Sequence, residues 1–259
     1  EAAVLDLVTG LTWRRCNIGQ VFENGECTGT ATTFTDIETG KASCDGAFGG
    51  IDNWRLPTPS ELATLIDYEI HYPGPTINAE VFPGTFTGTY LTSMSPLFRV
   101  SFYSGAITAK GSDSKVRCVS GASPQADIET RFVINEATVL DTWTNLEWQR
   151  CALGQSYQEG SCIGNGERVT RSDAQSACTG DWRLPTVIEL SSIVNPCGVT
   201  PSAYSEAFPN TPPTDFWSDT LFPDDDEKNW TVYFTTGWVE PTLHTGFARV
   251  RCVRTVLAP

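Results

Sequence analysis

The chain has 259 residues, of which 31 are acidic and 17 basic, so its net charge at pH 7 is −14. Nucleic-acid binding depends on clustered Lys and Arg, and this sequence contains no such cluster, so we expect no nucleic-acid partner. The hydrophobic content of 40%, with 8 Trp, is sufficient for a packed core and excludes wholesale disorder. No stretch reaches the roughly 20 apolar residues of a membrane-spanning helix.

The chain contains two copies of one unit. The matching segments are Val4–Cys27 with Val139–Cys162, the WRLPT motifs at Trp54–Thr58 and Trp182–Thr186, and the closing motifs at Lys115–Val119 and Arg249–Val253. Between the copies, the segment SGASPQAD carries small, polar and Pro residues, as linkers do. We therefore expect a first domain over residues 1–121, a linker over 122–128 and a second domain over 129–259.

Each copy predicts the same order of elements. The apolar spacing after Val4 and Val139 predicts an opening strand. Short helices are expected over 33–44 and 170–178, and a second helix after each WRLPT motif. There Thr58 and Thr186 are positioned as N-caps, with Glu61 and Glu189 completing capping boxes. Alternating segments at 100–103 and 232–234 and the closing VRCV motifs predict antiparallel strands. Helices followed by hairpins give an α+β fold class.

Eight of the nine cysteines occupy matching places in the two copies. Four cysteines per copy allow three pairings, and short intervals favour local bridges. The expected set is Cys16–Cys27, Cys44–Cys118, Cys151–Cys162 and Cys178–Cys252. A zinc site is the alternative, but the sequence has no C-x-x-C motif and only His71 and His244. Cys197 has no counterpart in the first copy, and we expect it to be a free, buried thiol rather than an intermolecular bridge or a nucleophile.

These motifs together, V-L-D-x-x-T-G-L-T-W-R-R-C, W-R-L-P-T-x-x-E-L and the closing V-R-C-V, resemble the Lcl carboxy-terminal domain family, named after a collagen-like adhesin of Legionella. The resemblance covers nearly all of both copies. It implies two tandem C-type-lectin-like domains, with a long disulfide from the first helix to the last strand. It also implies a place in bacterial surface proteins that adhere to glycans or other cells.

The sequence offers little material for catalysis. It contains no G-x-S-x-G, H-E-x-x-H or phosphate-binding Gly loop, so we expect no enzyme and no catalytic residues. Arg55, Glu61, Arg183 and Glu189 recur in both copies, which is better explained by a structural corner in which the Arg pairs or caps and the Glu caps. Trp54, Trp143, Trp148 and Trp182 are predicted core residues.

Function is instead expected where the copies differ, on loops between the late strands. The second copy is richer there, because exposed Trp beside carboxylates can stack on a sugar and bind its hydroxyls. The predicted binding surface is the loop from Asp219 to Trp230. Its predicted ligand-binding residues are Asp219, Asp224, Asp225, Asp226, Glu227, Trp230 and Trp238, with Tyr103 in the first copy. The alternative is that Trp230 and Trp238 are core residues and that the acidic run is a solvated loop.

The acidic run also raises a calcium hypothesis, with Asp224 and Asp226 as ligands. Calcium takes about six to eight oxygen ligands, and consecutive aspartates cannot all face one ion, so Asp219, Asn229 or backbone carbonyls must complete the cage. The run lacks the D-x-D-x-D-G spacing of helix-loop-helix calcium sites. No other cofactor is expected.

Two function classes remain open. The first is an exported adhesin module that binds glycans or surface proteins at the bacterial cell surface or on a pilus. The second is a structural module that assembles into a larger surface protein or fibre and binds protein rather than sugar. Disulfides form in oxidising compartments, so both place the chain outside the cytoplasm.

Overall fold

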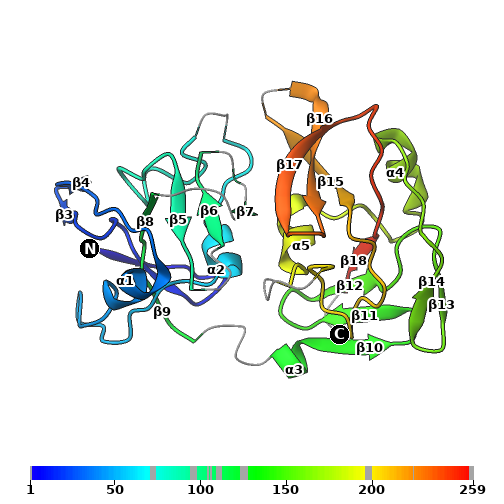
Figure 1. Cartoon of the computed structure of the whole chain (residues 1–259), viewed down its shortest axis with the longest axis horizontal. Coiled ribbons are helices and arrows are strands. Elements are labelled where there is room, and N and C mark those ends of the chain that lie inside the picture. The colour runs from blue at the N-terminus through cyan, green and yellow to red at the C-terminus, as the bar shows by residue number, and fades with distance from the viewer. Residues whose placement is uncertain are drawn as a thin grey trace. The chain divides into compact units, whose positions relative to one another are not determined.

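The computed structural model describes residues 2–70, 74–93, 98–103, 105, 107–108, 113–122, 128–195, 200–223 and 225–256. It divides into two compact units, Glu1–Ser123 and Pro124–Pro259, and most of the predicted linker lies outside the described residues. Both units are mostly β with a few short helices, and the two short helices predicted for each unit are present as α1 and α2 and as α4 and α5 (Figure 1). Cys197 and His71 also lie outside the described residues.

The first unit is built on two small sheets and a hairpin. One sheet has the order β1-β2-β9, another has the order β7-β6-β5-β8, and β3 pairs with β4. The bounds are β1 Ala3–Leu5, β2 Thr12–Arg14, β3 Val21–Glu23, β4 Glu26–Thr28, α1 Ile37–Ala42, α2 Pro59–Ala63, β5 Thr89–Leu91, β6 Arg99–Ser101, β7 Ile107–Thr108, β8 Ser114–Lys115 and β9 Val119–Ser120.

The second unit repeats this plan with longer strands. Its sheets have the orders β10-β11-β12-β18 and β15-β16-β17, and β13 pairs with β14 (Figure 1). The bounds are α3 Ile128–Arg131, β10 Phe132–Asn135, β11 Thr138–Asp141, β12 Leu146–Gln149, β13 Ser156–Gln158, β14 Ser161–Ile163, α4 Arg171–Ala177, α5 Val187–Ser192, β15 Asp215–Phe222, β16 Asp225–Tyr233, β17 Trp238–Leu243 and β18 Val253–Thr255.

A tryptophan lies at the centre of each unit's first sheet. Trp13 of β2 pairs with Val4 on one side and Val119 on the other, and Trp148 of β12 occupies the same place in the second unit. Both side chains are fully buried. Trp54 is also buried, as predicted, but Trp143 and Trp182 are only half-buried. The Arg254 guanidinium carbon lies 4.7 Å from the centroid of the Trp182 ring, so a cation rather than a core side chain covers one face of that ring.

The four disulfides join the cysteines that the spacing pairs. Cys16–Cys27 and Cys151–Cys162 close short loops, each with a sequence separation of 11. Cys44–Cys118 and Cys178–Cys252 each span 74 residues and tie the end of the first helix to the segment before the last strand. These long bridges constrain the unfolded chain most, because loop-closure entropy grows with loop length.

The WRLPT motif forms the structural corner that the repeats predict. Thr58 and Thr186 cap α2 and α5 in complete capping boxes with Glu61 and Glu189. Each Glu also forms a two-pronged ion pair with the Arg of its motif, with N–O distances of 2.7 and 2.8 Å in the first unit and 2.7 Å in the second. One carboxylate thus caps a helix and holds the arginine whose backbone forms a β-bridge with Val119 or Val253.

The first helix is shorter than predicted in the first unit. It covers Ile37–Ala42 rather than 33–44, because the Asp36 side chain accepts from the Thr39 N–H and so marks the helix start. Phe34, inside the predicted helix, instead forms a β-bridge with Ser114. In the second unit Thr170 caps α4 directly, and the helix matches the predicted range closely.

Candidate functional site

The clearest difference between the units is the hairpin formed by β15 and β16. These strands have 8 and 9 residues, whereas β5 and β6 of the first unit have 3 each. The prediction that the segment from Asp219 to Trp230 is a loop is therefore wrong, because most of this segment belongs to the paired strands β15 and β16. The buried side chains of Ser218 and Asn229 reinforce the ladder by bonding the opposite strand, at 2.6 Å to Trp230 O and 3.2 Å to Ser218 O.

The predicted acidic residues lie along this hairpin in different environments. Asp219 pairs with Arg171 at 2.5 Å, and Asp225 pairs with Lys228 at 2.8 Å. Hydrogen bonds from Lys228 and from the Glu227 N–H hold the pKa of Asp225 below its ordinary value. Asp226 and Glu227 are exposed, and Asp224 lies outside the described residues. The acids thus form no single cluster, because two of them already have cationic partners.

The calcium hypothesis gains no support from this arrangement. Among the residues that the structure describes, no group of three or more His, Cys, Asp or Glu is placed to hold a metal ion. Asp226 is exposed on β16, and Asp224, its expected companion, is outside the described range. A cage of six to eight oxygens, roughly what calcium takes, is not assembled by the described acids.

The aromatic residues predicted to bind the ligand differ in their exposure. Trp230 is only 4% exposed and packs edge-on against Phe222, with ring centroids 5.0 Å apart. The prediction of an exposed Trp230 is wrong, because the ring packs against Phe222 of the facing strand and β16 also contacts α5. Trp238 is half-buried at the start of β17, opposite Tyr233. Tyr103 of the first unit is exposed.

A pocket of about 510 Å³ lies between α4 and the hairpin. It contains polar groups from three segments of the second unit, together with one apolar side chain, the exposed Leu221. The lining residues are Thr170, Arg171, Ser172 and Gln175 at α4, Leu221 and Asn229 on the hairpin, and His244 and Thr245 after β17. Seven of these eight residues carry polar side chains, which suits a ligand that binds through hydrogen bonds rather than an apolar one.

Arg171 is the principal charged group of the pocket. Its side chain is 11% exposed, and one terminal nitrogen donates to Asp219. The other two guanidinium nitrogens, Nε and Nη1, are buried and find no acceptor among the residues that the structure describes. Buried donors without an acceptor are uncommon, since each costs desolvation free energy. The Arg171 N–H also donates to His244 O at 3.2 Å, which joins α4 to the opposite wall.

His244 and the buried Asn229 form a fixed hydrogen-bonded pair. The Asn229 amide donates to Ser218 O, so its Oδ1 is the acceptor for His244 Nε2, at 2.7 Å. The neutral imidazole therefore carries its proton on Nε2, and Nδ1 is the ring acceptor. Glu227 lies beside this pair, because its carbonyl accepts from the His244 N–H at 2.7 Å. The predicted acidic hairpin and the pocket are thus parts of one surface.

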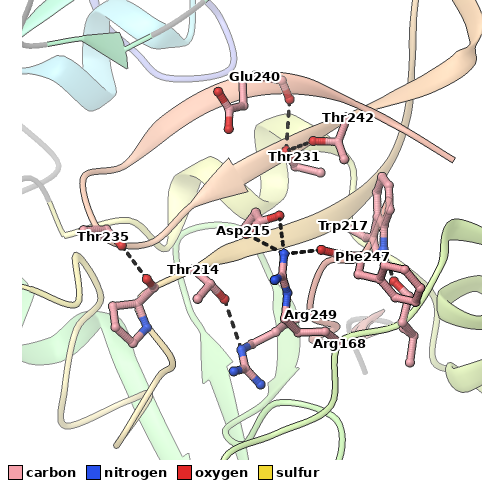
Figure 2. A network of polar contacts seen from close by, with 12 residues as sticks. Arg168, Thr214, Asp215, Trp217, Thr231, Thr235, Glu240, Thr242, Phe247 and Arg249 are labelled. Carbon is pink, nitrogen blue, oxygen red and sulfur yellow. Dashed lines mark hydrogen bonds and ion pairs between the residues drawn. The ribbon is translucent and has the colours of Figure 1, made fainter. Parts of the chain in front are cut away.

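A polar network fixes the base of the hairpin against the rest of the second unit (Figure 2). Arg168 reaches Asp215 at 3.3 Å and also donates to Phe247 O, while Arg249 donates to Thr214 Oγ1 at 3.0 Å. Trp217 Nε1 donates to Val169 O at 2.8 Å, immediately before α4. These contacts hold β15 and the start of α4 in one arrangement, so the two walls of the pocket are positioned together.

The first unit lacks these pocket residues. Ile37 stands where Arg171 does, at the same distance before its bridged cysteine, and packs against the core. Ser93 stands where Asp219 does, since the N–H of each donates to the Pro of its WRLPT motif. The sequence prediction missed Arg171 and Gln175, whereas Asn229 lies within the predicted loop from Asp219 to Trp230. The alignment of the two copies offered a signal, because charged Arg171 and Asp219 stand where the first copy has Ile37 and Ser93.

A family model described as the Lcl C-terminal domain matches the chain twice, over residues 2–120 and 137–254. Comparison with curated proteins found no match. None of the helices within the described ranges is long and apolar enough to cross a bilayer.

Proposed function

Because the chain belongs to the Lcl C-terminal domain family, we propose that it is an exported module of a bacterial surface adhesin whose second unit binds a glycan in the pocket between α4 and the hairpin. Four disulfides and the adhesin-associated family support an extracellular, oxidising setting. The repeated sheets, short helices and long disulfides are also consistent with a C-type-lectin-like fold, which we propose for each unit.

The observation that carries this proposal is the set of pocket residues present only in the second unit. Gln175, Asn229 and His244 offer donors and acceptors of the kind that sugar hydroxyls require. Leu221, 54% exposed, offers an apolar surface for the face of a sugar ring. The exposed Asp226 and Glu227 extend the polar surface from the pocket along the hairpin. In this proposal Trp230 supports the site from inside, and the module binds rather than catalyses.

A glycan array tests this proposal with a matched pair of variants. Gln175→Glu places a negative charge in the pocket, whereas Gln158→Glu makes the same change on the exposed β13. We expect Gln175→Glu to weaken the array signal at least about tenfold, because the new carboxylate is desolvated by a bound sugar. Gln158→Glu should bind as the unchanged chain does. Equal binding by both variants would remove the pocket from the site.

A structural role in a fibre is the second candidate, and one observation favours it. Ile37 and Ser93 stand in the first unit where the second unit has Arg171 and Asp219, so the proposed sugar site does not account for the first unit. A glycan array with no signal for the unchanged chain would favour this second function.

A further inference from the structure

An irregularity in the hairpin of the second unit directs Asp219 toward α4. The register of β15 and β16 shifts between Trp217 and Leu221, so β15 bulges at this point. The Asp219 N–H donates to Pro185 O, outside the hairpin, and the Asp219 carboxylate reaches Arg171 at the start of α4. Bulges commonly re-aim side chains beside binding sites. The bulge therefore places a carboxylate at the border of the pocket.

The Arg171–Asp219 pair presents an oxygen to the pocket rather than a cation. Asp219 Oδ1 accepts from Arg171 Nη2 at 2.5 Å, and within the described ranges Oδ2 has no partner. The Asp219 side chain is 57% exposed, which leaves Oδ2 available to a ligand. The other two nitrogens of Arg171 are buried, so the guanidinium is directed at Asp219. A carboxylate held in this way is an acceptor of fixed orientation.

A second acceptor is tied to the same arginine. His244 Nε2 is bonded to Oδ1 of the buried Asn229 at 2.7 Å, which leaves Nδ1 as the acceptor of the neutral ring. His244 is half-buried and lines the pocket. The Arg171 backbone N–H donates to His244 O at 3.2 Å, so His244 and Asp219 are both bonded to one residue. Two acceptors thus converge on one end of the pocket.

The charge around these acceptors is negative. The described cations of α4 and the hairpin are already paired, Arg171 with Asp219 and Lys228 with Asp225. Asp226 and Glu227 are exposed and have no cationic partner among the residues that the structure describes. The Glu227 carbonyl accepts from the His244 N–H at 2.7 Å, so the unpaired charge borders the pocket. A carboxylate or sulfate on a ligand would face like charge, which opposes binding.

Given the glycan function proposed above, on which this inference rests, we infer that the pocket takes a neutral sugar and excludes uronic acids and sulfated sugars. The sugar donates two of its hydroxyls, one to Asp219 Oδ2 and one to His244 Nδ1. Hydrogen bonds to a charged acceptor are stronger than those between neutral groups, so the contact with Asp219 is the stronger of the two. Arg171 is a positioning residue, because it acts on the sugar through Asp219.

A glycan array with matched probes tests the ligand class. Each set contains a neutral hexoside, the same hexoside oxidised at its primary alcohol to the uronic acid, and a sulfated derivative. We expect the neutral member to give at least about tenfold more signal than either acid, because like charges across an interface are costly. Added salt should reduce this difference, since it screens the repulsion.

Asp219→Asn tests the charged contact. It keeps the shape of the side chain and removes its charge, so we expect the signal of the neutral probes to fall at least about tenfold. Glu147→Gln is the matched control, because it breaks another arginine–carboxylate pair of the second unit, that of Glu147 with Arg254, outside the hairpin. This control should bind as the unchanged chain does.

A double-mutant cycle tests the positioning role of Arg171. Arg171→Gln should weaken the binding of the neutral probes, but it should add little in the Asp219→Asn background, because the two residues act as a unit. A merely structural role would make the two losses additive. Additive losses would therefore overturn the positioning role of Arg171.

Asp226→Asn combined with Glu227→Gln tests the exclusion of acids. This double variant should raise the signal of the acidic probes severalfold relative to the neutral ones, because the unpaired charge beside the pocket is removed. Glu136→Gln combined with Glu159→Gln changes the net charge equally, in the exposed turns after β10 and β13, and is the control. The ratio of acidic to neutral signal should not change in the control.

Three results would overturn the inference while leaving a glycan site in the second unit. They are a preference for the acidic probes, a preference for sugars that carry a free amine, and undiminished binding of the neutral probes by Asp219→Asn. An array without any signal for the unchanged chain would instead remove the proposed glycan function, and the ligand class with it.

Discussion

The two units share a frame and differ in the surface around it. The central Trp, the long disulfide and the capped corner of WRLPT are the same in both. In the second unit one edge is closed by β10 and the other is extended into the hairpin beside Arg171. In the first unit β5 and β6 have 3 residues each, and Ile37 fills the place of Arg171. Duplication has therefore kept the stabilising contacts and changed the surfaces that surround them.

The largest expected effect is on the hairpin, which only the second unit extends. Trp230→Ala should destabilise that unit by about 4 kcal/mol, because a buried side chain is removed and a cavity remains. Tyr103→Ala in the first unit should cost less than about 1 kcal/mol, since its ring is 40% exposed. If calorimetry resolves one unfolding transition for each unit, Trp230→Ala should lower the temperature of the second unit's transition only. A simultaneous shift of both transitions would mean that the units unfold together.

The sequence predicted the shared frame well. The repeats located the corner, the capping boxes and the opening and closing strands, because each depends on local residue patterns such as Thr-x-x-Glu. The cysteine spacing predicted the four bridges. The hairpin was mistaken for a loop because Asp224, Asp225, Asp226 and Glu227 are poor strand formers, and the pairing of β15 with β16 overrides that local preference.

The pocket was not predictable to the same degree. Its walls come from α4, the hairpin and the segment after β17, which the chain brings together only when folded. The predicted residues Asp219 and Glu227 do border it, whereas Trp230 lies beneath the surface and Asp225 pairs with Lys228. Strand register decides which face of the sheet a side chain such as Trp230 occupies. The register of β15 and β16 is irregular, and the sequence showed no sign of that irregularity.

The next largest effect concerns strand β10, which closes the outer edge of β11 in the second unit. Asp141→Ala should cost about 3 kcal/mol, because it leaves the buried Arg131 guanidinium without its partner. Asp6→Ala, the matched change in the first unit, should cost at most about 1 kcal/mol, since within the described ranges the Asp6 carboxylate accepts only from Val8 and Thr9. Urea denaturation of the two variants measures the difference. Equal losses would show that β10 contributes little to closing the sheet.

Smaller and equal effects are expected where the units agree. Thr58→Ala and Thr186→Ala should each cost about 1 kcal/mol, because both remove the side-chain acceptor of a complete capping box. Serine at either position retains the acceptor and is the control. A marked difference between the two Ala variants, measured by thermal unfolding, would show that the corners are not equivalent despite their shared motif.

The smallest effect distinguishes the corners by their exposure. The Glu189 side chain is 20% exposed and its partner Arg183 is 43% exposed, whereas Glu61 in the first unit is 3% exposed. Burial raises the pKa of Glu189, but hydrogen bonds from Arg183 and the Thr186 N–H outweigh it, and the pKa lies below its ordinary value of 4.5. A carboxylate whose pKa is lowered by folding contributes stability above its unfolded pKa, and that contribution is lost as pH falls through the folded pKa.

Glu189→Gln should therefore be less stable than the unchanged chain at pH 7, by less than about 1 kcal/mol because solvent screens the pair. The difference in free energy of unfolding between the two proteins should become smaller as pH falls below 4.5, because Glu189 of the unchanged chain then also becomes protonated. Added salt should narrow the gap in the same direction at pH 7. Glu159→Gln, at the exposed turn between β13 and β14, makes the same change in charge outside the corner and is the control. Carboxylates titrate within roughly pH 3 to 7. If the difference in free energy of unfolding between Glu189→Gln and the unchanged chain stays constant over that range, Glu189 acts through packing and capping geometry rather than through its charge.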